Sequence, residues 1–445
     1  MDNTLAYLDQ GSFLGLRALG RGPIDQAVWI YDRPVDLDGL LRFRRNLDNG
    51  LLGRRIERSP LPFGRHRWVS DPAPQSLDMS ARDCRRAELW SWADDCMRAP
   101  IDPEHGPSWR LSVQPFSDGG AAVSLVTSHS IVDGLGLITA VVDAANGVDR
   151  NLGYPPPKSR PRGRALAQDT RQMLRSVPSM ARAVVASVKV ARAESGDLAT
   201  SFKAAADTPA GDDRPLLPPS VVAFVDAEQW DACARRLGGT SNSLFSAVAS
   251  RLGGRLGRVD EDGLAYLSWP VSERTEGDTR ANALVEASMS VDPEQVVTDL
   301  TALRAATKQA LATSAETSVR MTGPLPLTPL TPQAMLRRLE GMVLAVNSPI
   351  ACSNMGELDP AFGRIDGADA SSAVIRGLEP QITSRVLNRI GGQLLLAGCR
   401  LRGQMSVAVG SWTVGGPNSK EELRDVVVET LADFGLTGVV EGPAA

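Results

Sequence analysis

The sequence predicts an α/β protein built from two lobes. At 445 residues the chain is longer than a single hydrophobic core usually supports. Strand-like and helix-like patterns alternate in both halves, and a stretch rich in proline and basic residues, 155–164, separates them. We therefore expect an N-terminal lobe over residues 1–152, a linker with a helix over 153–219 and a C-terminal lobe over 220–445.

The first half predicts strands and helices around one hairpin. Trp109–Phe116 and Ala121–Val126 read as strands joined by Asp118-Gly119-Gly120, a sequence typical of a tight turn. Val132–Ala145 predicts a helix that begins near Asp133. The remaining elements expected here are strands at 26–31 and 68–69 and helices at 37–47 and 83–97, the last with Asp83 as a candidate cap.

The linker and the second half continue the alternation. The linker predicts a helix that is interrupted at Pro178 and resumes over Ser179–Ala193, because proline removes a helical hydrogen bond. We expect later strands at 221–225, 264–270, 393–399, 404–409 and around Trp412, and helices from Asp226 and over 241–256, 294–312 and 420–434.

Composition excludes several classes of function. The net charge of −4 argues against a nucleic-acid partner, which usually leaves a basic footprint. The first residues resemble no secretory signal, and no apolar stretch approaches the roughly 18 residues of a spanning helix. Five scattered cysteines and three histidines suggest neither a disulfide framework nor a metal site. We expect a cytoplasmic protein without a tightly bound cofactor, whose contact with membranes is at most peripheral.

The candidate catalytic group is His129, in the sequence Ser128-His129-Ser130-Ile131-Val132-Asp133-Gly134. The apolar strand 121–126 delivers His129 at its end, where a helix begins. Transfer of an acyl group to an alcohol or amine requires a base that removes a proton as the nucleophile attacks. A histidine titrates near neutral pH and is suited to that role. A satisfied structural histidine is the alternative.

Asp133 and Gly134 are expected to support the motif. Asp133 either orients the imidazole, as in a catalytic triad, or points away and pairs with an arginine. We favour the second and expect Arg110, on the paired strand, to be its partner. Gly134 is the residue best able to allow a close approach and unusual backbone angles.

The motif resembles the HHxxxDG sequence of CoA-dependent acyltransferases: peptide condensation domains, wax ester synthase/diacylglycerol acyltransferases and polyketide-associated acyltransferases. Other segments resemble that superfamily in the same order along the chain. They are Tyr7–Phe13, Gly53–Val69, Pro107-Ser108-Trp109, Pro270–Arg274 with Asn282, and Cys352–Gly356 with Ser353-Asn354.

The resemblance implies two chloramphenicol-acetyltransferase-like lobes that form a pseudo-dimer, with an active-site tunnel between them. It implies His129 as general base, Asp133 as a structural residue, and an acyl-CoA or acyl-carrier-protein thioester as donor. The acceptor is a small molecule or a lipid, and an acyl carrier protein is an expected partner. Residues expected near substrate are Ser128, Trp109, Asn282, Ser353 and Asn354.

The sequence departs from the superfamily pattern in three places. Ser128 replaces the first histidine, Ser108 the leucine of Pro-Leu-Trp, and Met355-Gly356 a Val-Pro pair. The departures leave open which substrate is used. They also leave two alternatives, a non-catalytic condensation-like module that binds a carrier or enzyme partner, and a different reaction in the same tunnel, such as cyclisation or dehydration.

Several other charged residues have plain interpretations. We expect His105 to lie at the surface, and we expect the charge of Arg65 and Arg67 to disfavour protonation of His66. Arg274 and Arg280 are expected to pair at the surface with Glu273, Glu276 and Asp278. The basic run 158–164 is read as a solvated linker, and the helix 180–193 either packs against a lobe or lies on a membrane.

Overall fold

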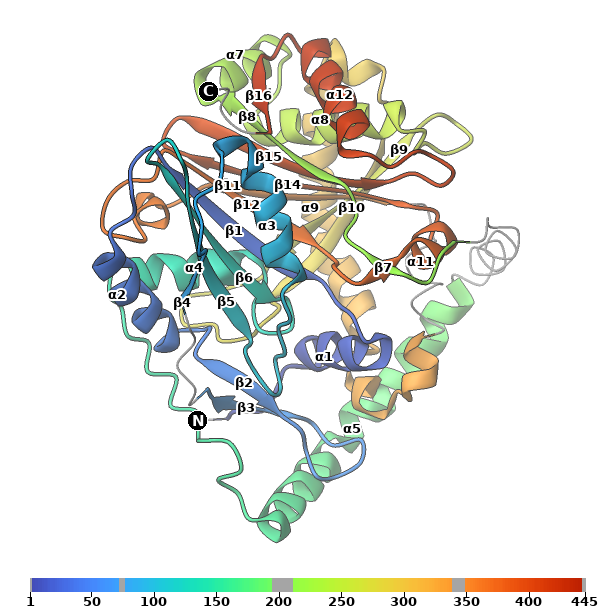
Figure 1. Ribbon diagram of the computed structural model, residues 1–445. Coiled ribbons are helices and arrows are strands. Elements are labelled where there is room, and N and C mark those ends of the chain that lie inside the picture. The colour runs from blue at the N-terminus through green and yellow to red at the C-terminus, as the bar shows by residue number, and fades with distance from the viewer. Residues whose placement is uncertain (1, 72–76, 194–210, 338–348, 442–445) are drawn as a thin grey trace.

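The structure is a computed structural model that describes residues 2–71, 77–193, 211–337 and 349–441, apart from the side chains of 189–193 and 315–321. Two large sheets organise these residues (Figure 1). The first has the strand order β12-β1-β6-β5-β4, and the second has the order β10-β9-β11-β14-β15-β8-β16. Residues 194–210 of the predicted linker lie outside the described residues.

The first sheet is built around a strand that is buried along its whole length. β6 pairs antiparallel with β1 on one side and with β5 on the other, and the β5–β6 hairpin turns at residues 118–120 as predicted. The strands of this sheet are β1 (Ile24–Tyr31), β4 (Leu77–Met79), β5 (Trp109–Pro115), β6 (Ala121–Ser128) and β12 (Ser372–Leu378). The separate pair β2 (Arg54–Glu57) and β3 (Arg67–Ser70) lies below it (Figure 1).

Four helices accompany this sheet: α1 (Tyr7–Leu19), α2 (Leu37–Asp48), α3 (Leu89–Arg98) and α4 (Gly134–Ala145). α2 and α4 pack together, and their apolar faces join Trp29, Trp109 and Leu125 in one core. Asp133 caps α4 by accepting a hydrogen bond from the Gly136 amide at 2.7 Å. This cap fixes where the strand-to-helix loop ends.

The second sheet carries the C-terminal half. Its strands are β8 (Ser220–Asp226), β9 (Ala265–Ser272), β10 (Leu284–Val291), β11 (Ile350–Glu357), β14 (Gln393–Leu401), β15 (Gln404–Trp412) and β16 (Gly438–Val440). The helices α7 (Ala227–Arg236), α8 (Ser241–Arg255) and α12 (Lys420–Asp433) lie over its upper face in Figure 1. They share a core with the sheet around Trp230, Phe245 and Phe434.

The two halves are joined by β12, which lies late in the chain and pairs with β1 in the first sheet. An apolar cluster formed by Val28, Trp90, Phe224, Val374 and Ala408 therefore contains residues from both halves. The domain division at residues 153–219 stays a prediction. The sequence patterns did not indicate that β12, a strand from the second half of the chain, belongs to the first sheet.

Three helix predictions need correction. The helix in the linker, α5 (Arg162–Ala193), continues through Pro178. The predicted helix 83–97 begins only at Leu89, after a 3-10 turn at Arg86–Glu88, so Asp83 is not its cap. The predicted helix 294–312 is a 3-10 turn, Gln295–Val297, followed by α9 (Thr301–Thr322).

The remaining elements of the described residues are short. They are β7 (Pro215–Leu216), β13 (Ile382–Thr383), α11 (Ser384–Arg389), and the 3-10 turns η3 (Leu325–Leu330) and η4 (Pro360–Gly363). Within the described ranges, no helix combines the length and the apolar character required to cross a bilayer.

Candidate active site

His129 lies in the loop between β6 and α4. Its backbone is held on two sides: the N–H donates to the Pro23 carbonyl at 3.2 Å, and the carbonyl accepts from the Asn282 side chain at 3.3 Å. The imidazole itself is 27% exposed. A ring whose backbone is fixed while one side stays open can exchange a proton with a bound molecule.

A buried carboxylate, Asp25, lies beside the imidazole. Its Oδ2 is 3.9 Å from His129 Nε2, and this oxygen has no hydrogen-bond partner among the described residues. Burial raises the pKa of Asp25 to about 6, the charge of His129 opposes the rise, and Asp133 adds to it. A side chain in place of Gly377, on β12, would bring its Cβ to 3.1 Å from Asp25 Oδ1, so this glycine leaves room for the carboxylate.

Asp133 does not pair with Arg110, and that expectation was wrong. Its Oδ1 forms an ion pair with Arg274 at 2.8 Å, and its Oδ2 accepts from the Ala283 amide at 2.9 Å. Arg110 instead binds Asp78, on the neighbouring strand β4, at 3.1 Å. Asp133 therefore ties the loop to residues 273–283, which connect β9 to β10.

The same connection is tied to α1. The carboxylate of Asp9 is fully buried and accepts from the amides of Ala281 at 3.0 Å and Asn282 at 2.8 Å. Burial raises the pKa of Asp9, while these hydrogen bonds oppose the rise. Arg54 links the same connection to the motif loop: it donates to the Ile131 carbonyl at 2.8 Å and to the Thr279 carbonyl. Its guanidinium lies over the Trp68 ring. The loop is thus held from three elements.

Three residues expected near substrate are buried parts of the framework. Trp109 is fully buried, and its Nε1–H donates to the Leu52 carbonyl at 3.2 Å, so it is a core residue. Ser128 is 4% exposed, and its Oγ accepts from the Ser130 amide at 3.3 Å. Asn282 is 5% exposed and holds the His129 carbonyl. All three side chains are buried in this structure, and their contact with substrate stays a prediction.

Ser353 and Asn354 lie on β11, beside the motif in space. The next residue, Met355, packs against the core of the first sheet, and a Cβ on Gly134 would meet its Cε at 3.0 Å. The expected close approach at Gly134 is therefore confirmed, although Gly134 is not among the glycines with positive φ. Asn354 is engaged with Asn242 at 2.9 Å and with the Gly356 amide.

The remaining charged residues divide as follows. His105 is exposed, as expected, with 72% of its side chain accessible. Burial, aided by Arg58, lowers the pKa of His66 to about 4, which confirms the expected direction but gives burial as the main cause. Arg280 pairs with Asp278 at 2.6 Å as expected, whereas the surface pairing expected of Arg274 was wrong.

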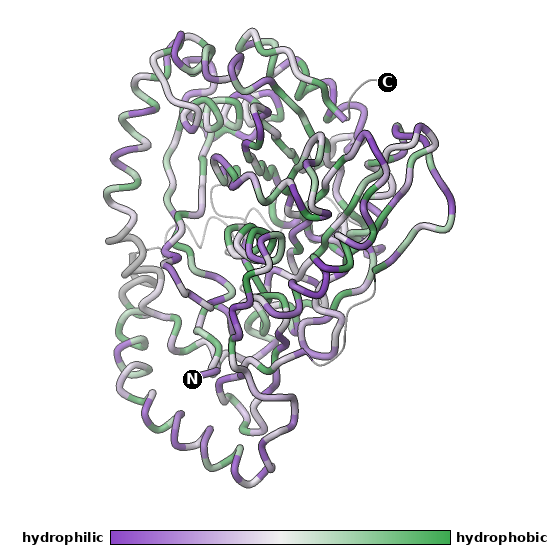
Figure 2. Tube along the Cα trace, turned by 90° about the vertical axis from the view of Figure 1, so that its left-hand side faces the viewer, coloured by the Kyte–Doolittle hydropathy of each residue, from purple (hydrophilic) through white to green (hydrophobic). Residues whose placement is uncertain are grey.

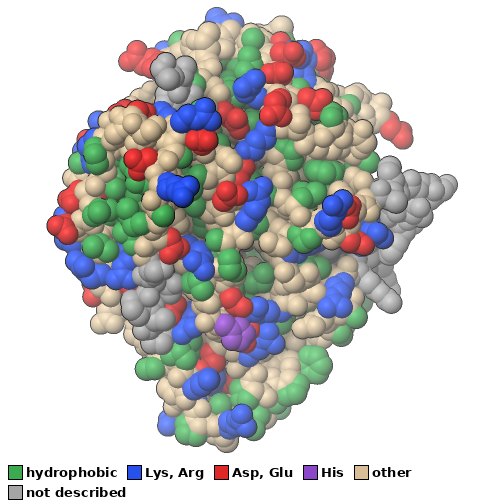
Figure 3. Space-filling model, viewed as in Figure 1, with side chains coloured by type: hydrophobic (Ala, Val, Ile, Leu, Met, Phe, Trp, Pro, Cys, Tyr) green, Lys and Arg blue, Asp and Glu red, His purple; other side chains and the backbone are tan. Residues whose placement is uncertain are grey.

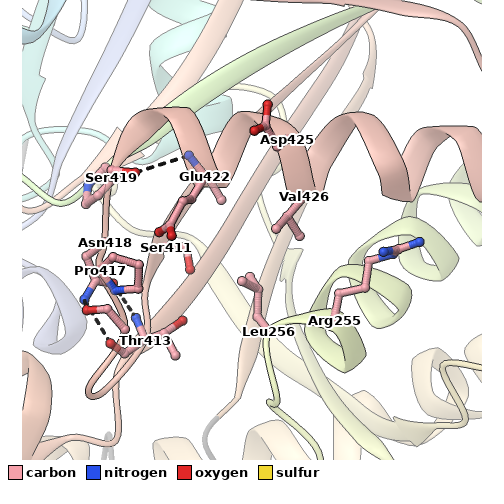
Figure 4. Close-up of a pocket in the computed structure, with 13 residues that line it drawn as sticks. Arg255, Leu256, Ser411, Thr413, Pro417, Asn418, Ser419, Glu422, Asp425 and Val426 are labelled. Atoms are coloured by element: carbon pink, nitrogen blue, oxygen red, sulfur yellow. Dashed lines mark hydrogen bonds between the residues drawn. The ribbon is translucent and has the colours of Figure 1, made fainter.

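No group of three or more histidine, cysteine or acidic side chains within the described ranges could hold a metal ion. A pocket of about 370 Å³ lies away from His129, against the start of α12 and the end of α8 (Figure 4). Its lining includes Arg255, Ser411, Asn418 and Glu422 and contains neither His129 nor Asp25. It is a separate feature of the second lobe.

Sequence comparison gives limited matches. No protein-family model matches the chain. Over 147 residues it is 29% identical to proteins from two strains of Mycobacterium tuberculosis that are provisionally named as diacylglycerol O-acyltransferases. The matched stretch covers 30% of this chain and 28% of those relatives, so the alignment spans less than a third of either protein.

Solved structures match over almost the whole chain. The first condensation domain of the CDA synthetase covers 99% of both chains with a TM-score of 0.54 and 14% identity. Polyketide synthase associated protein 5 from Mycobacterium tuberculosis covers 96% of this chain and 97% of its own, with a TM-score of 0.51 and 14% identity. The chain has the condensation-domain fold. The two-lobed α/β architecture and the resemblance to the HHxxxDG superfamily are confirmed at the level of fold.

Four residues around His129 were missed or misassigned from sequence. Asp25 was missed because the strand predicted from sequence began at Gln26, whereas β1 begins at Ile24 and therefore contains this acidic residue. Asp9 and Arg54 fall in segments that resemble the superfamily, but nothing in their spacing indicates which backbone atoms they hold. Arg274 is surrounded in sequence by acidic residues, and this local charge pattern hid its distant partner.

Proposed function

We propose that this protein transfers an acyl group from a thioester to a hydroxyl or amine, with His129 as the general base. The observation that carries the proposal is the pairing of a partly exposed imidazole with the buried Asp25 carboxylate, 3.9 Å apart. Support also comes from the condensation-domain fold and from the similarity to proteins named as acyltransferases.

In this proposal, His129 accepts the proton of the acceptor O–H or N–H as the oxygen or nitrogen attacks the thioester carbonyl. The carbonyl carbon–sulfur bond then breaks, and the imidazolium returns the proton to the leaving thiolate. Asp25 acts through His129: its negative charge stabilises the imidazolium that forms in between, the role that an aspartate has in a catalytic triad. Asp133 is not available for that role, because Arg274 and two backbone amides occupy its oxygens.

The donor in this proposal is an acyl-CoA or an acyl group on a carrier protein, and the acceptor is a small molecule or a lipid. The expected tunnel between the lobes would bring donor and acceptor to His129 from opposite faces. Asn354 and Ser353, on β11 beside the motif, are the polar residues proposed to face substrate. Ser128 stands where the superfamily has its first histidine. The proposed chemistry uses His129 alone as the base, and the Ser128 Oγ accepts a hydrogen bond from the Ser130 amide.

The proposal is tested with His129→Ala, and His105→Ala serves as the matched control because that imidazole is 72% exposed and contacts Asp102. Purified proteins are incubated with a panel of acyl-CoAs and with long-chain alcohols, diacylglycerol or small amines and alcohols. Thiol release and acylated products are followed by absorbance and mass spectrometry. Loss of the base is expected to lower turnover about 10²- to 10⁴-fold, with the fold unchanged by circular dichroism. Undiminished turnover in His129→Ala would refute the proposal.

A further inference from the structure

α5 (Arg162–Ala193) differs from an ordinary surface helix because it exposes six large apolar side chains to solvent. The side that packs on the protein carries small and polar residues: Ala165 and Ala183 are buried, and Asp169, 2% exposed, binds Arg67 and Arg160, each at 2.9 Å. Gln172, one turn on, donates to the Thr4 hydroxyl at 2.8 Å. Surface helices normally bury their apolar stripe and expose their charges, so the outward face of α5 needs an explanation.

The outward face carries a continuous apolar stripe. At about 100° per residue, six exposed side chains fall within an arc of about 100° that extends for about 33 Å along the helix. They are Leu166, Leu174, Val177, Val184, Val185 and Val188, with exposed fractions between 40% and 67%. The helix forms the lower right edge of the molecule in Figure 1, and Figure 2 shows apolar and polar residues alternating along it.

A basic stripe runs beside the apolar one. Arg164, Arg171, Arg175 and Arg182 are exposed and project within an arc of about 40°, next to the leucines and valines. The helix contains a single acidic residue, Asp169, and that residue is buried on the opposite side. In the view of Figure 3, hydrophobic and basic side chains both reach the surface at the lower end of the molecule, where α5 begins.

We propose that α5 binds the surface of a membrane rich in anionic lipid, with its apolar stripe in the boundary between head groups and acyl chains. An apolar face flanked by arginines is the pattern of helices that lie in the plane of a membrane interface. The arginines meet lipid phosphates while the leucines and valines leave water. This proposal does not depend on the acyl-transfer chemistry at His129.

The charge pattern argues against the other occupants. A second copy packed through α5 would offer these arginines no acidic partner, because the single acidic residue of the helix, Asp169, is buried. An acidic protein would satisfy the arginines but would not account for the apolar stripe of about 33 Å beside them. A flat anionic bilayer fits both stripes at once.

The test is flotation of the full chain with phosphatidylcholine vesicles, with and without phosphatidylglycerol. We expect flotation only with the anionic vesicles, and release at high salt. Arg171→Gln with Arg175→Gln is expected to weaken binding about 25-fold, about fivefold for each charge. Leu174→Gln with Val185→Gln is expected to weaken it at least tenfold, because two apolar side chains lose their burial.

Val428→Gln with Arg424→Gln, on the exposed side of α12, is the matched control and should bind as the unaltered protein does. A second measurement needs no variant: amide hydrogen exchange in α5 should slow when anionic vesicles are added. The proposal is overturned if the protein does not float with anionic vesicles, or if both stripe variants float as well as the unaltered protein does. It is also overturned if light scattering shows a dimer that the stripe variants dissociate, or if the stripe captures a purified acidic carrier protein but not vesicles.

Discussion

Two aspartates near His129 have opposite environments, and this difference decides their roles. Asp133 is saturated by Arg274 and by backbone amides, whereas Asp25 Oδ2 is buried without a hydrogen-bond partner among the described residues. The protein keeps Asp25 in a place where burial raises its pKa to about 6. A group held at such a cost is expected to serve the reaction rather than the fold.

Asp25→Asn is predicted to separate stability from activity. Because the folded-state pKa of about 6 lies above the usual aspartate value of 3.8, ionisation of Asp25 destabilises the folded protein as pH rises from about 4 through 6. The neutral asparagine avoids this, so the variant should be more stable at pH 8 by as much as about 3 kcal/mol, with little difference at pH 4. Turnover at pH 8 should fall about tenfold, because the imidazolium loses its neighbouring charge. Thermal melts and turnover across pH measure both.

Asp48→Asn is the matched control for that variant. Burial also raises the pKa of Asp48 to about 6, but this residue lies at the end of α2 and its charged neighbours are Arg44 and Asp71. It should gain stability at pH 8, by less than Asp25→Asn because Asp48 is partly exposed and pairs with Arg44, and it should keep full activity. If Asp25→Asn loses stability and activity together, Asp25 is a structural residue and its proposed effect on His129 is wrong.

At the scale of elements, the motif loop depends on the connection between β9 and β10. Residues 273–283 meet Asp133 through Arg274, Asp9 through the amides of Ala281 and Asn282, and Arg54 through the Thr279 carbonyl. One lobe therefore supplies the histidine and the other supplies the backbone that fixes its loop. The geometry at His129 is expected to change whenever this connection moves.

Arg274→Ala is predicted to disturb the site, and Arg110→Ala is its control. The Arg274–Asp133 pair is buried, with side chains 9% and 7% exposed, so its loss should cost about 3 kcal/mol and at least tenfold in turnover. The Arg110–Asp78 pair is partly exposed, at 27% and 41%, and its loss should cost less than about 1 kcal/mol. Urea denaturation and turnover of the two variants decide between them. If Arg110→Ala lowered stability and turnover as much as Arg274→Ala does, Arg110 would support the motif as the sequence predicted.

Sequence patterns predict the local elements of this chain and miss its long-range partners. The hairpin at residues 118–120 and the helix capped by Asp133 follow from turn chemistry and periodicity within a few residues. Arg274 is separated from Asp133 by 141 positions, and β12 reaches β1 from the far end of the chain. No local rule encodes such pairings, because the energy that selects them arises only when the two lobes pack.

At the scale of the whole molecule, one buried arginine contacts elements of both lobes. Arg376, on β12, is 2% exposed and binds Asp94 of α3 at 2.8 Å, Gln26 of β1 at 2.7 Å and Ser220 of β8 at 2.9 Å. Lys420, the first residue of α12, reaches the other oxygen of Asp94 at 2.6 Å. The network touches both sheets and lies within the apolar contact between them.

Arg376→Met is predicted to weaken the union of the lobes. Methionine keeps much of the volume, but among the described residues Asp94 then retains only Lys420 as a charged partner, and breaking a buried ion pair from one side costs about 3–5 kcal/mol. Arg364→Met removes an exposed pair with Asp369 and should cost less than about 1 kcal/mol. Guanidinium denaturation followed by tryptophan fluorescence measures both, since Trp90 lies 5.5 Å from the Arg376 guanidinium. Because His129 is held by residues from the second lobe, activity should fall at denaturant concentrations below the main unfolding transition. A shift no larger than that of Arg364→Met would show that the apolar contact alone joins the lobes.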